Sequence, residues 1–385
     1  MKAQRSSHPH QSAHEGDAVA ADGPFAARGL RVVRSARRNC AWWYGHVHCG
    51  SENLSFDTHK FFMISHGLRL PQDLSYGLIA RMGTEAEYVG IGYCSNDHLA
   101  VVPFIPMDTK VQMLSHAILG GGPAGNSTAG AAALGKKAAF IGTVGDDPDG
   151  RTILSDFESQ GVDTSFMKVR KGATSAIAYL WIEERTGNRS CAWTREGLAE
   201  LSADEVDLGL VCGAQVLHID GHQPQAAIAA AKAAREAGVL VNYDAGTYRD
   251  GTPDLLPLAD VLICSEEFIL RLTGLSDAEE AVRQVWEKYR PKVCGATMGI
   301  RGSMCFDGVD FLKCPAFPVE KVVDTTGCGD LFHTGFAIRY LETQDLMESQ
   351  RFGAAVSALK CRGLSGRPPS APTRAEVDAF LAAHA

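Results

Sequence analysis

From residue 86 onward, short apolar runs alternate with segments of helical periodicity, and this alternation constrains the fold more than any other feature. The runs typical of β-strands are residues 88–92, 138–142, 216–219, 239–243 and 261–264. The helical segments are residues 126–134, 150–160, 224–237 and 278–289. Strands that alternate with helices build parallel βαβ units in one sheet covered on both faces. The sequence therefore predicts an α/β fold.

Two regions interrupt this rhythm. Residues 99–106 and 110–119 have the pattern of extended segments, and residues 175–184 and 188–193 have the pattern of a hairpin that turns at 185–187. We expect them to form a small separate β-sheet, from about residues 97–119 and 175–195. Ligands bind at strand ends in open α/β folds, so a sheet placed there would act as a lid. The exposed lid would also pair between two copies, which predicts a homodimer.

The first 81 residues differ from the rest of the chain. They hold ten Lys and Arg against six Asp and Glu, and no amphipathic period runs through them. The regular pattern starts abruptly after Met82. We therefore expect residues 1–81 to be a poorly ordered or non-native extension, Met82 to be the natural start, and residues 82–385 to form the folded domain.

Composition excludes several classes of function. Residues 82–385 hold 27 Lys and Arg against 39 Asp and Glu, and this acidic balance argues against nucleic-acid binding. There is no long apolar stretch for a membrane span, nor a complete dinucleotide or Gly-x-Ser-x-Gly motif. The eleven cysteines are odd in number and show no pairing rhythm, which favours the reducing cytoplasm.

The most informative motif is Asp324-Thr-Thr-Gly-Cys-Gly-Asp330, followed by an apolar run at helical spacing. Glycines just before a helix leave backbone N–H groups open at the positive end of the helix dipole, which suits phosphate oxygens. Asp330 would sit in the first turn, where a carboxylate often only caps the helix. Phosphoryl transfer, however, uses such an anion cradle beside a base that activates a hydroxyl.

A second motif, Gly120-Gly-Gly-Pro-Ala-Gly-Asn126, precedes a helix of small residues. Asn126 would begin that helix. Its amide either caps the helix or holds a substrate hydroxyl, since it can both donate and accept.

With both motifs present in this order, the chain resembles the PfkB/ribokinase family of carbohydrate kinases from about Glu87 to its C-terminus. The resemblance implies a Rossmann-like ribokinase fold, in which helices flank a central, mostly parallel sheet and a small β-sheet forms a lid. It implies transfer of the ATP γ-phosphate to a hydroxyl of a small carbohydrate, with Mg²⁺. It leaves a requirement for a monovalent cation open.

The family's functional residues carry over to matching positions. Asp330 matches the general base, and Gly327, Cys328 and Gly329 match the loop that forms the anion hole. The positions expected to bind the sugar are Asp97, Gly121, Gly122 and Asn126. The positions expected to approach ATP are Thr297, Gly299, Gly302 and Thr325.

Two positions depart from the family pattern. Cys328 stands where alanine is usual; at a helix N-terminus its thiol would have a lowered pKa and be sensitive to oxidants, or it is only a small filler. The metal-linked Asn-x-x-Glu motif should fall where Glu266 and Glu267 stand. These acids either act on Mg²⁺ through water or are solvated residues of a helix start.

The identity of the sugar is less constrained. Residues 351–367 resemble ketose and sulfofructose kinases, and Lys110 lies where such enzymes present a cation to an acidic substrate. Trp193 on the lid hairpin would stack on a sugar or pack internally. The alternatives are a nucleoside kinase, which needs an aromatic slot for the base, and a nucleotide-binding regulator without turnover.

Overall fold

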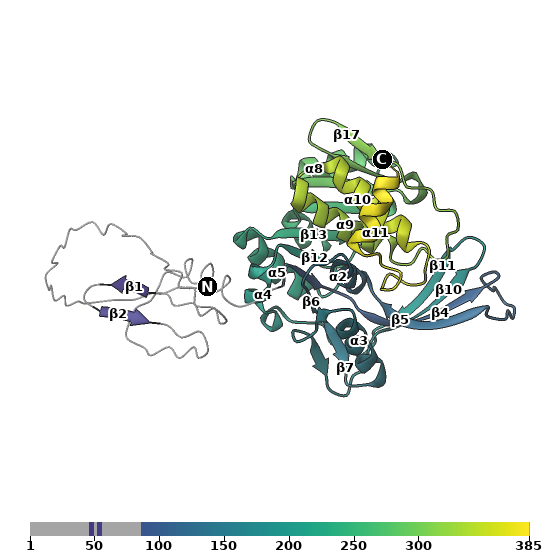
Figure 1. Cartoon of the computed structure of the whole chain (residues 1–385), viewed down its shortest axis with the longest axis horizontal. Coiled ribbons are helices and arrows are strands. Elements are labelled where there is room, and N and C mark those ends of the chain that lie inside the picture. Colours follow the sequence, from purple (N-terminus) through teal and green to yellow (C-terminus); the bar gives the residue numbers. More distant parts are fainter. Residues whose placement is uncertain (1–45, 50–51, 56–85, 385) are drawn as a thin grey trace, which may run out of the picture. The chain divides into compact units, whose positions relative to one another are not determined.

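The computed structural model describes residues 46–49, 52–55 and 86–384 (Figure 1). The chain divides into two units, Met1–Arg69 and Leu70–Ala385. In the first, β1 (His46–Cys49) pairs antiparallel with β2 (Glu52–Ser55). The rest of residues 1–81, and Met82 itself, lie outside the described residues. The interpretation of this stretch as an extension therefore stays a prediction.

A nine-stranded sheet forms the centre of the second unit, with the order β17-β16-β15-β14-β13-β12-β3-β6-β8. Neighbouring strands run parallel except for the pairs β15–β16 and β16–β17. This arrangement confirms the predicted α/β fold with a mostly parallel sheet. The strands are β3 (Tyr88–Ile91), β6 (Ala138–Ile141), β8 (Val162–Asp163), β12 (Val216–Ile219), β13 (Leu240–Ala245), β14 (Val261–Ser265), β15 (Val293–Thr297), β16 (Ser303–Phe306) and β17 (Phe311–Cys314).

Helices cover both faces of this sheet, and each face has its own apolar core (Figure 1). Val89 and Ile91 of β3 belong to the core on the side of α4, α5, α7 and α8, whereas Tyr88 belongs to the core on the side of α2, α3, α9, α10 and α11. Alternate residues of a strand point to opposite faces, which explains why the buried strands are mostly apolar on both faces. The helices are α2 (Pro123–Ala133), α3 (Pro148–Ser159), α4 (Leu208–Gly213), α5 (Pro224–Ala237), α6 (Thr252–Leu255), α7 (Glu266–Thr273), α8 (Ala278–Tyr289), α9 (Cys328–Thr343), α10 (Leu346–Lys360) and α11 (Arg374–Ala383), with 3₁₀ turns η1 (Ala203–Glu205), η2 (Leu256–Leu258) and η3 (Gly299–Arg301).

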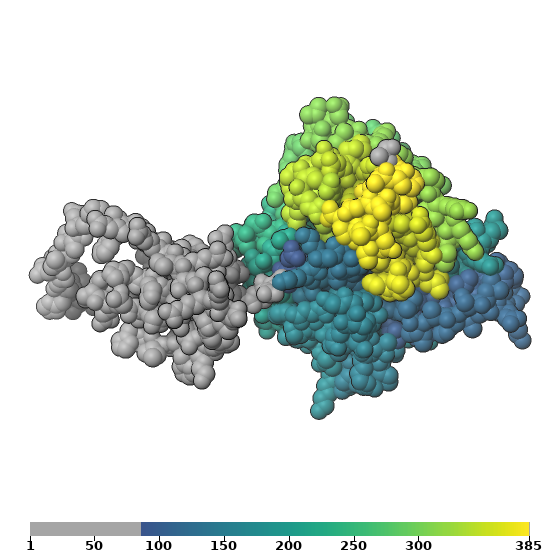
Figure 2. Space-filling view, viewed as in Figure 1, coloured from purple at the N-terminus to yellow at the C-terminus, as the bar shows by residue number. Residues whose placement is uncertain are grey.

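A separate four-stranded sheet, the lid, has the order β11-β10-β4-β5 and extends away from the central sheet (Figures 1 and 2). Its strands are β4 (Ser95–Val102), β5 (Ser115–Gly121), β10 (Ile177–Glu183) and β11 (Arg189–Thr194). This confirms the predicted small sheet. Strand β4 begins earlier than expected because Ser95 pairs with Gly121 and Asn96 with Gly120. A further two-stranded sheet joins β7 (Thr143–Gly145) to β9 (Lys168–Arg170).

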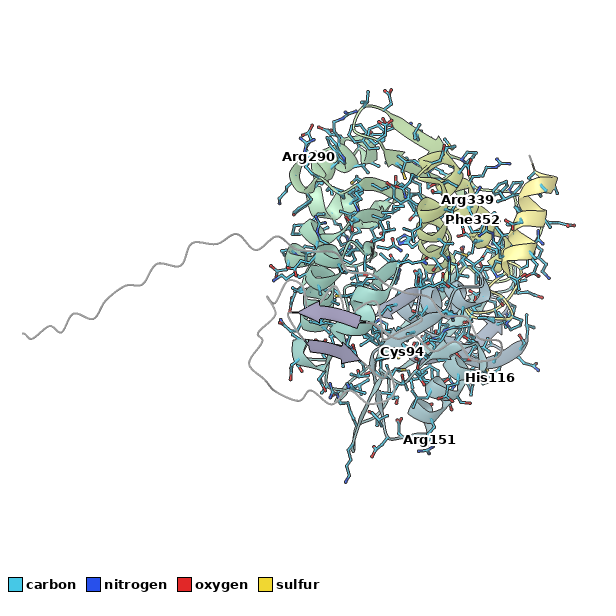
Figure 3. All side chains as sticks on the ribbon, turned by 60° about the vertical axis from the view of Figure 1, so that its left-hand side comes forward. Cys94, His116, Arg151, Arg290, Arg339 and Phe352 are labelled. Carbon is cyan, nitrogen blue, oxygen red and sulfur yellow. The ribbon has the colours of Figure 1, made fainter. Side chains whose placement is uncertain are left out.

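The two faces of the lid differ. One face packs a small core of Leu99, Ala178, Leu180 and Ile182. On the other face, Ile118 and Tyr179 are 47% and 49% exposed. His116, on the same lid strand as Ile118, is also exposed and is labelled in Figure 3. Among the described residues, no helix is long and apolar enough to cross a membrane.

Candidate active site

The two glycine-rich motifs meet at a single hydrogen bond. Asn126 Nδ2 donates to Asp330 Oδ2 at 2.7 Å, although the two residues are 204 positions apart in the chain. Asn126 lies at the end of the first turn of α2, and Asp330 lies in the first turn of α9. The fold therefore places the beginnings of two helices, and one polar side chain from each, at the same point.

Neither of these two side chains caps its helix. Helix α2 starts at Pro123 and not at Asn126, so the expectation that Asn126 begins the helix is wrong, because Pro123 supplies the fixed φ that suits a first helical position. Helix α9 is preceded by Gly327 and has no capping hydrogen bond from a side chain. The capping interpretation therefore accounts for neither residue.

The loop before α9 has the geometry of an anion site. Gly327 has a φ of 78°, in the left-handed region, and a Cβ there would lie 2.5 Å from Gly366 Cα. Gly329 is exposed, and a Cβ on it would meet nothing within 4 Å. The start of a sixteen-residue helix favours negative charge, although the Cys328 N–H also makes a long hydrogen bond to the Thr325 carbonyl at 3.3 Å.

Asp330 belongs to a group of carboxylates at the ends of the central strands. Burial raises its pKa, while the hydrogen bond from Asn126 and the charge of Arg189 lower it. Asp244, at the end of β13, has a pKa raised well above its ordinary value by burial and by the charge of Asp330. His333 Nδ1 lies 3.4 Å from Asp244 Oδ1.

Asp97 lies at the base of the lid, 4% exposed. Its Oδ1 accepts a hydrogen bond from Ser95 Oγ at 2.5 Å, and burial raises its pKa to about 6. A Cβ on Gly121 would lie 2.0 Å from Asp97 Oδ2, so only glycine leaves room for this carboxylate. Gly122, with a φ of 87°, approaches the Tyr93 carbonyl in the same way.

Unpaired polar atoms surround this part of the site. Tyr93 Oη and His222 Nδ1, whose rings stack 4.8 Å apart, are buried and have no hydrogen-bond partner among the residues with described positions. Buried polar groups are usually paired, so these two atoms are open to hydrogen bonds from a polar ligand. The ring of Trp193 lies 5.5 Å from that of Tyr93 and 6.0 Å from that of His222, and its side chain is 50% exposed. It is therefore held in place and still offers a free face.

Sequence reasoning assigned no role to Arg367, which is 1% exposed. Its Nε donates to Asn126 Oδ1 at 3.2 Å, Nη1 to Asp156 Oδ2 at 3.0 Å, and Nη2 to the Gly121 carbonyl at 3.0 Å. Because the arginine occupies the amide oxygen, the amide nitrogen of Asn126 must face Asp330. No local pattern distinguishes this arginine from a solvated one.

Asp220 was also missed. It follows β12, and its carboxylate accepts hydrogen bonds from the backbone N–H groups of Tyr93, Ala124 and His222 at 2.9, 3.1 and 2.9 Å. It thus ties the end of β3 to the start of α2. Its place after a parallel strand is the signal that could have found it.

The residues expected to approach ATP follow β15 or lie in the anion-hole loop. Thr297 ends β15, and Gly299 begins the exposed turn η3. Gly302 has a φ of 92° and would carry a Cβ 2.0 Å from the Cys314 carbonyl, so packing against the protein requires this glycine. Thr325 donates from its N–H and its Oγ1 to the Gly187 carbonyl, both at 3.1 Å. The turn of the lid hairpin therefore rests on the anion-hole loop.

A cavity of about 690 Å³ lies beside this contact, lined by Pro103, residues 184–186 and residues 319–322. Its lining does not include Asp330. Lys110 lies in the exposed connection between β4 and β5.

The expectation of a lowered pKa at Cys328 is wrong. The Sγ atoms of Cys328 and Cys361 are 3.3 Å apart. This hydrogen bond and burial raise the pKa of Cys328, whereas the same hydrogen bond lowers the pKa of Cys361 to about 7. The more acidic thiol of the pair is therefore that of Cys361, and not that of Cys328 at the start of α9.

Glu266 and Glu267 begin α7 behind the cap formed by Ser265. Glu266 is paired with Arg301, and Glu267, 76% exposed, lies 3.4 Å from Arg271. No cluster of three metal-ligating side chains occurs in the part of the chain that the structure describes. This is compatible with Mg²⁺, which usually binds through one or two carboxylates, water and the phosphates of the substrate.

Comparison with known proteins identifies the family of this chain. Residues 86–374 match the pfkB family of carbohydrate kinases. The ATP-dependent ribose-1-phosphate kinase of Halopiger xanaduensis is 30% identical over 278 residues, which cover 71% of this chain and 90% of that protein. Fructokinase-1 of Zea mays is 31% identical over 285 residues, which cover 67% of this chain and 86% of that protein.

The fold agrees as well. The structure of Arabidopsis thaliana ribokinase complexed with ribose and ATP superimposes with a TM-score of 0.65 at 26% identity, covering 77% of this chain and 99% of that one. The chain therefore belongs to the pfkB family of carbohydrate kinases, enzymes that transfer phosphate to a sugar hydroxyl.

Proposed function

We propose that this protein transfers the γ-phosphate of ATP to a hydroxyl of a small sugar, with Asp330 as the general base. The observation that carries the proposal is the hydrogen bond between Asn126 and Asp330, which joins the two motifs at the open start of α9. A base beside an anion cradle is the arrangement that phosphoryl transfer requires.

In this mechanism the sugar hydroxyl loses its proton to the Asp330 carboxylate as its oxygen attacks the γ-phosphorus. The bond between that phosphorus and the β–γ bridging oxygen breaks, and ADP leaves. The N–H groups of Gly327, Cys328 and Gly329 hold the charge that develops on the phosphoryl oxygens. Asn126 keeps the carboxylate oriented, and Arg367 keeps Asn126 oriented.

Thr297, Gly299, Gly302 and Thr325 are the proposed ATP contacts. When bound, Mg²⁺ neutralises charge on the phosphates. Glu266, now paired with Arg301, is the proposed carboxylate that would hold it through water. The exposure of Glu267 and its pairing with Arg271 make it a poorer candidate.

On the sugar side, Asp97, Asn126 and the unpaired atoms of Tyr93 and His222 are the proposed hydroxyl partners. Gly121 leaves room for the Asp97 carboxylate, and Gly122 leaves room for the Tyr93 backbone. The free face of Trp193 offers a surface for the sugar ring.

A specific observation favours a sugar with an anionic group. Arg195 Nη1 and Arg249 Nε are buried atoms without a hydrogen-bond partner in the described region. After burial, the charges of Arg249 and Arg195 are what lower the pKa of His222, to about 2, so both arginines lie near that ring. Arginine forks suit phosphate, sulfonate and carboxylate groups. The ribose-1-phosphate kinase named above acts on such a substrate. These arginines are stronger candidates for this role than the exposed Lys110.

We also propose that the enzyme works in the cytoplasm as a homodimer joined through the lid. The nine cysteines from Cys94 to Cys361 form no disulfide, which suits a reducing compartment. The exposed Ile118 and Tyr179 give the lid an apolar outer face.

The test is Mg-ATP-dependent ADP release with a panel of neutral ketoses and aldoses, phosphorylated, sulfonated and carboxylated sugars, and nucleosides. We expect turnover with a sugar. If the best substrate is anionic, Arg195→Met and Arg249→Met should raise its KM and leave the KM for ATP unchanged. Turnover only with nucleosides would favour the nucleoside-kinase alternative. Tight ATP binding without turnover on any substrate would favour the regulator.

A further inference from the structure

Lys360 is a buried charge that no step of the proposed transfer uses. It is the last residue of α10, and its side chain is 0% exposed. Taking an ammonium group out of water is costly unless oxygen atoms replace the water, so a lysine in this position needs a specific set of partners.

The partners of Lys360 are oxygen atoms of the anion-hole loop and of the turn after α10. Its Nζ donates to the Asp324 carbonyl at 2.5 Å and to the Gly363 carbonyl at 3.3 Å. Asp324 Oδ2, itself fully buried, lies 3.7 Å away. The ammonium group therefore has two backbone carbonyls and one carboxylate around it.

Asp324 connects this charge to the loop. Its Oδ1 accepts from the N–H and Oγ1 of Thr326 at 2.8 and 2.7 Å, and its Oδ2 accepts from the N–H of Ser365 at 2.8 Å. Ser365 Oγ in turn donates to the Gly120 carbonyl at 2.9 Å. One cluster thus holds the segment just before Gly327, the turn after α10 and the glycine-rich end of β5.

We propose that the Lys360 ammonium is a built-in cation that fixes the anion-hole loop, so that this kinase needs no monovalent metal ion to order it. Backbone carbonyls together with a carboxylate are the oxygen ligands that hold K⁺, and an ammonium group binds to the same oxygens. Because Lys360 is tethered, its charge is present at all salt concentrations. Lys360 is a positioning residue: it acts on the phosphoryl group only through the loop. The role in turnover rests on the proposed function; the occupation of the cation site does not.

The first experiment uses the unaltered protein. After exhaustive dialysis into tetramethylammonium chloride, kcat should be the same as in KCl or NaCl at equal ionic strength. A wild-type enzyme that is inactive in tetramethylammonium chloride and activated by K⁺ would overturn the proposal.

The second experiment removes the charge. In Lys360→Ala, kcat in tetramethylammonium chloride should fall by roughly tenfold or more while the KM for sugar changes little. K⁺ or NH₄⁺ should restore kcat, because the vacated oxygens can then hold a free cation. Lys232→Ala, which removes an exposed lysine of α5, is the matched control and should show neither effect. A purely structural role predicts a loss that no particular cation restores, and that result would overturn the proposal.

A third readout does not depend on activity. The thermal unfolding midpoint of Lys360→Ala should rise in K⁺ relative to tetramethylammonium, and that of the wild type should not. An equal response of both proteins would count against the inference.

If the wild type phosphorylates nothing in the substrate panel, the proposed function fails, and the cation-specific shift of the unfolding midpoint still tests the role of Lys360. If Lys360→Ala does not fold, the cation panel on the wild type decides.

Discussion

In the proposed mechanism Asp330 must be ionised to accept a proton, so its neighbours set the pH range of the reaction. Burial raises its pKa and the hydrogen bond from Asn126 lowers it. Activity requires the carboxylate, so kcat/KM should fall as the pH drops through this pKa. The ordinary pKa of an aspartate is about 4, and the acid limb is therefore expected at a higher pH than that.

Asn126→Leu tests this balance. Loss of the donor removes a hydrogen bond from another side chain that favours the charged form, so the acid limb of kcat/KM should move to higher pH. A full pH profile of wild type and variant measures the shift. Because the limb's position is independent of the maximal rate, an unchanged limb in a slower variant would contradict the role assigned to Asn126.

Cys328 and Cys361 are close enough to form a disulfide. With hydrogen peroxide, the two thiols should lose two hydrogen atoms and two waters should form, and Cys361 should react first because its thiol has a pKa of about 7. Peptide mapping should find the 328–361 link in the wild type and not in Cys361→Ser. Finding exposed Cys191 oxidised while both partners stay reduced would contradict this prediction.

At the scale of elements, the glycine-rich end of β5 leaves room for the Asp97 carboxylate. Gly121→Ala would put a methyl group 2.0 Å from Asp97 Oδ2 and push the carboxylate from its place. The KM for sugar should rise, on the order of a hundredfold for a displacement of about 1 Å. The KM for ATP serves as the internal reference and should stay unchanged. Equal losses for both substrates would mean that the change disturbs more than the sugar side.

Some elements were predictable because their ends carry local signals. Helix α5 has Pro224 in its first turn and Gly238 after its end, and α8 follows the cap Asp277; both helices have the predicted bounds. The start of α2 was less clear, because the glycines before Pro123 hide it. The two glycine-rich motifs could be found in the sequence from the spacing of their glycines. The hydrogen bond between Asn126 and Asp330 could not be predicted from it.

The buried cations could not be predicted at all. Arg367 meets Asn126 across 241 residues, and Lys360 meets Asp324 across 36. In a sequence, a lysine or arginine is most simply interpreted as a solvated surface residue. Only the fold shows that these two hold the loops that present Asp330.

At the scale of the whole molecule, the lid is the proposed surface through which two copies associate. Its outer face exposes Ile118 and Tyr179, so we expect a dimer whose interface includes them. Tyr179→Glu should produce a monomer in sedimentation velocity experiments. Val309→Glu, at another exposed apolar residue, is the control and should leave the dimer intact. A wild type that is monomeric at every concentration would exclude this interface.

The most direct test of the central claim is the kinetics of Asp330→Asn beside its affinity for ATP. The substitution keeps the shape of the side chain and removes its ability to accept a proton. We expect kcat to fall by about three or more orders of magnitude, as for loss of a base that acts with its surroundings, while ATP binding measured by calorimetry stays near that of the wild type. Near-normal turnover in Asp330→Asn would contradict the assignment of the base and, with it, the mechanism.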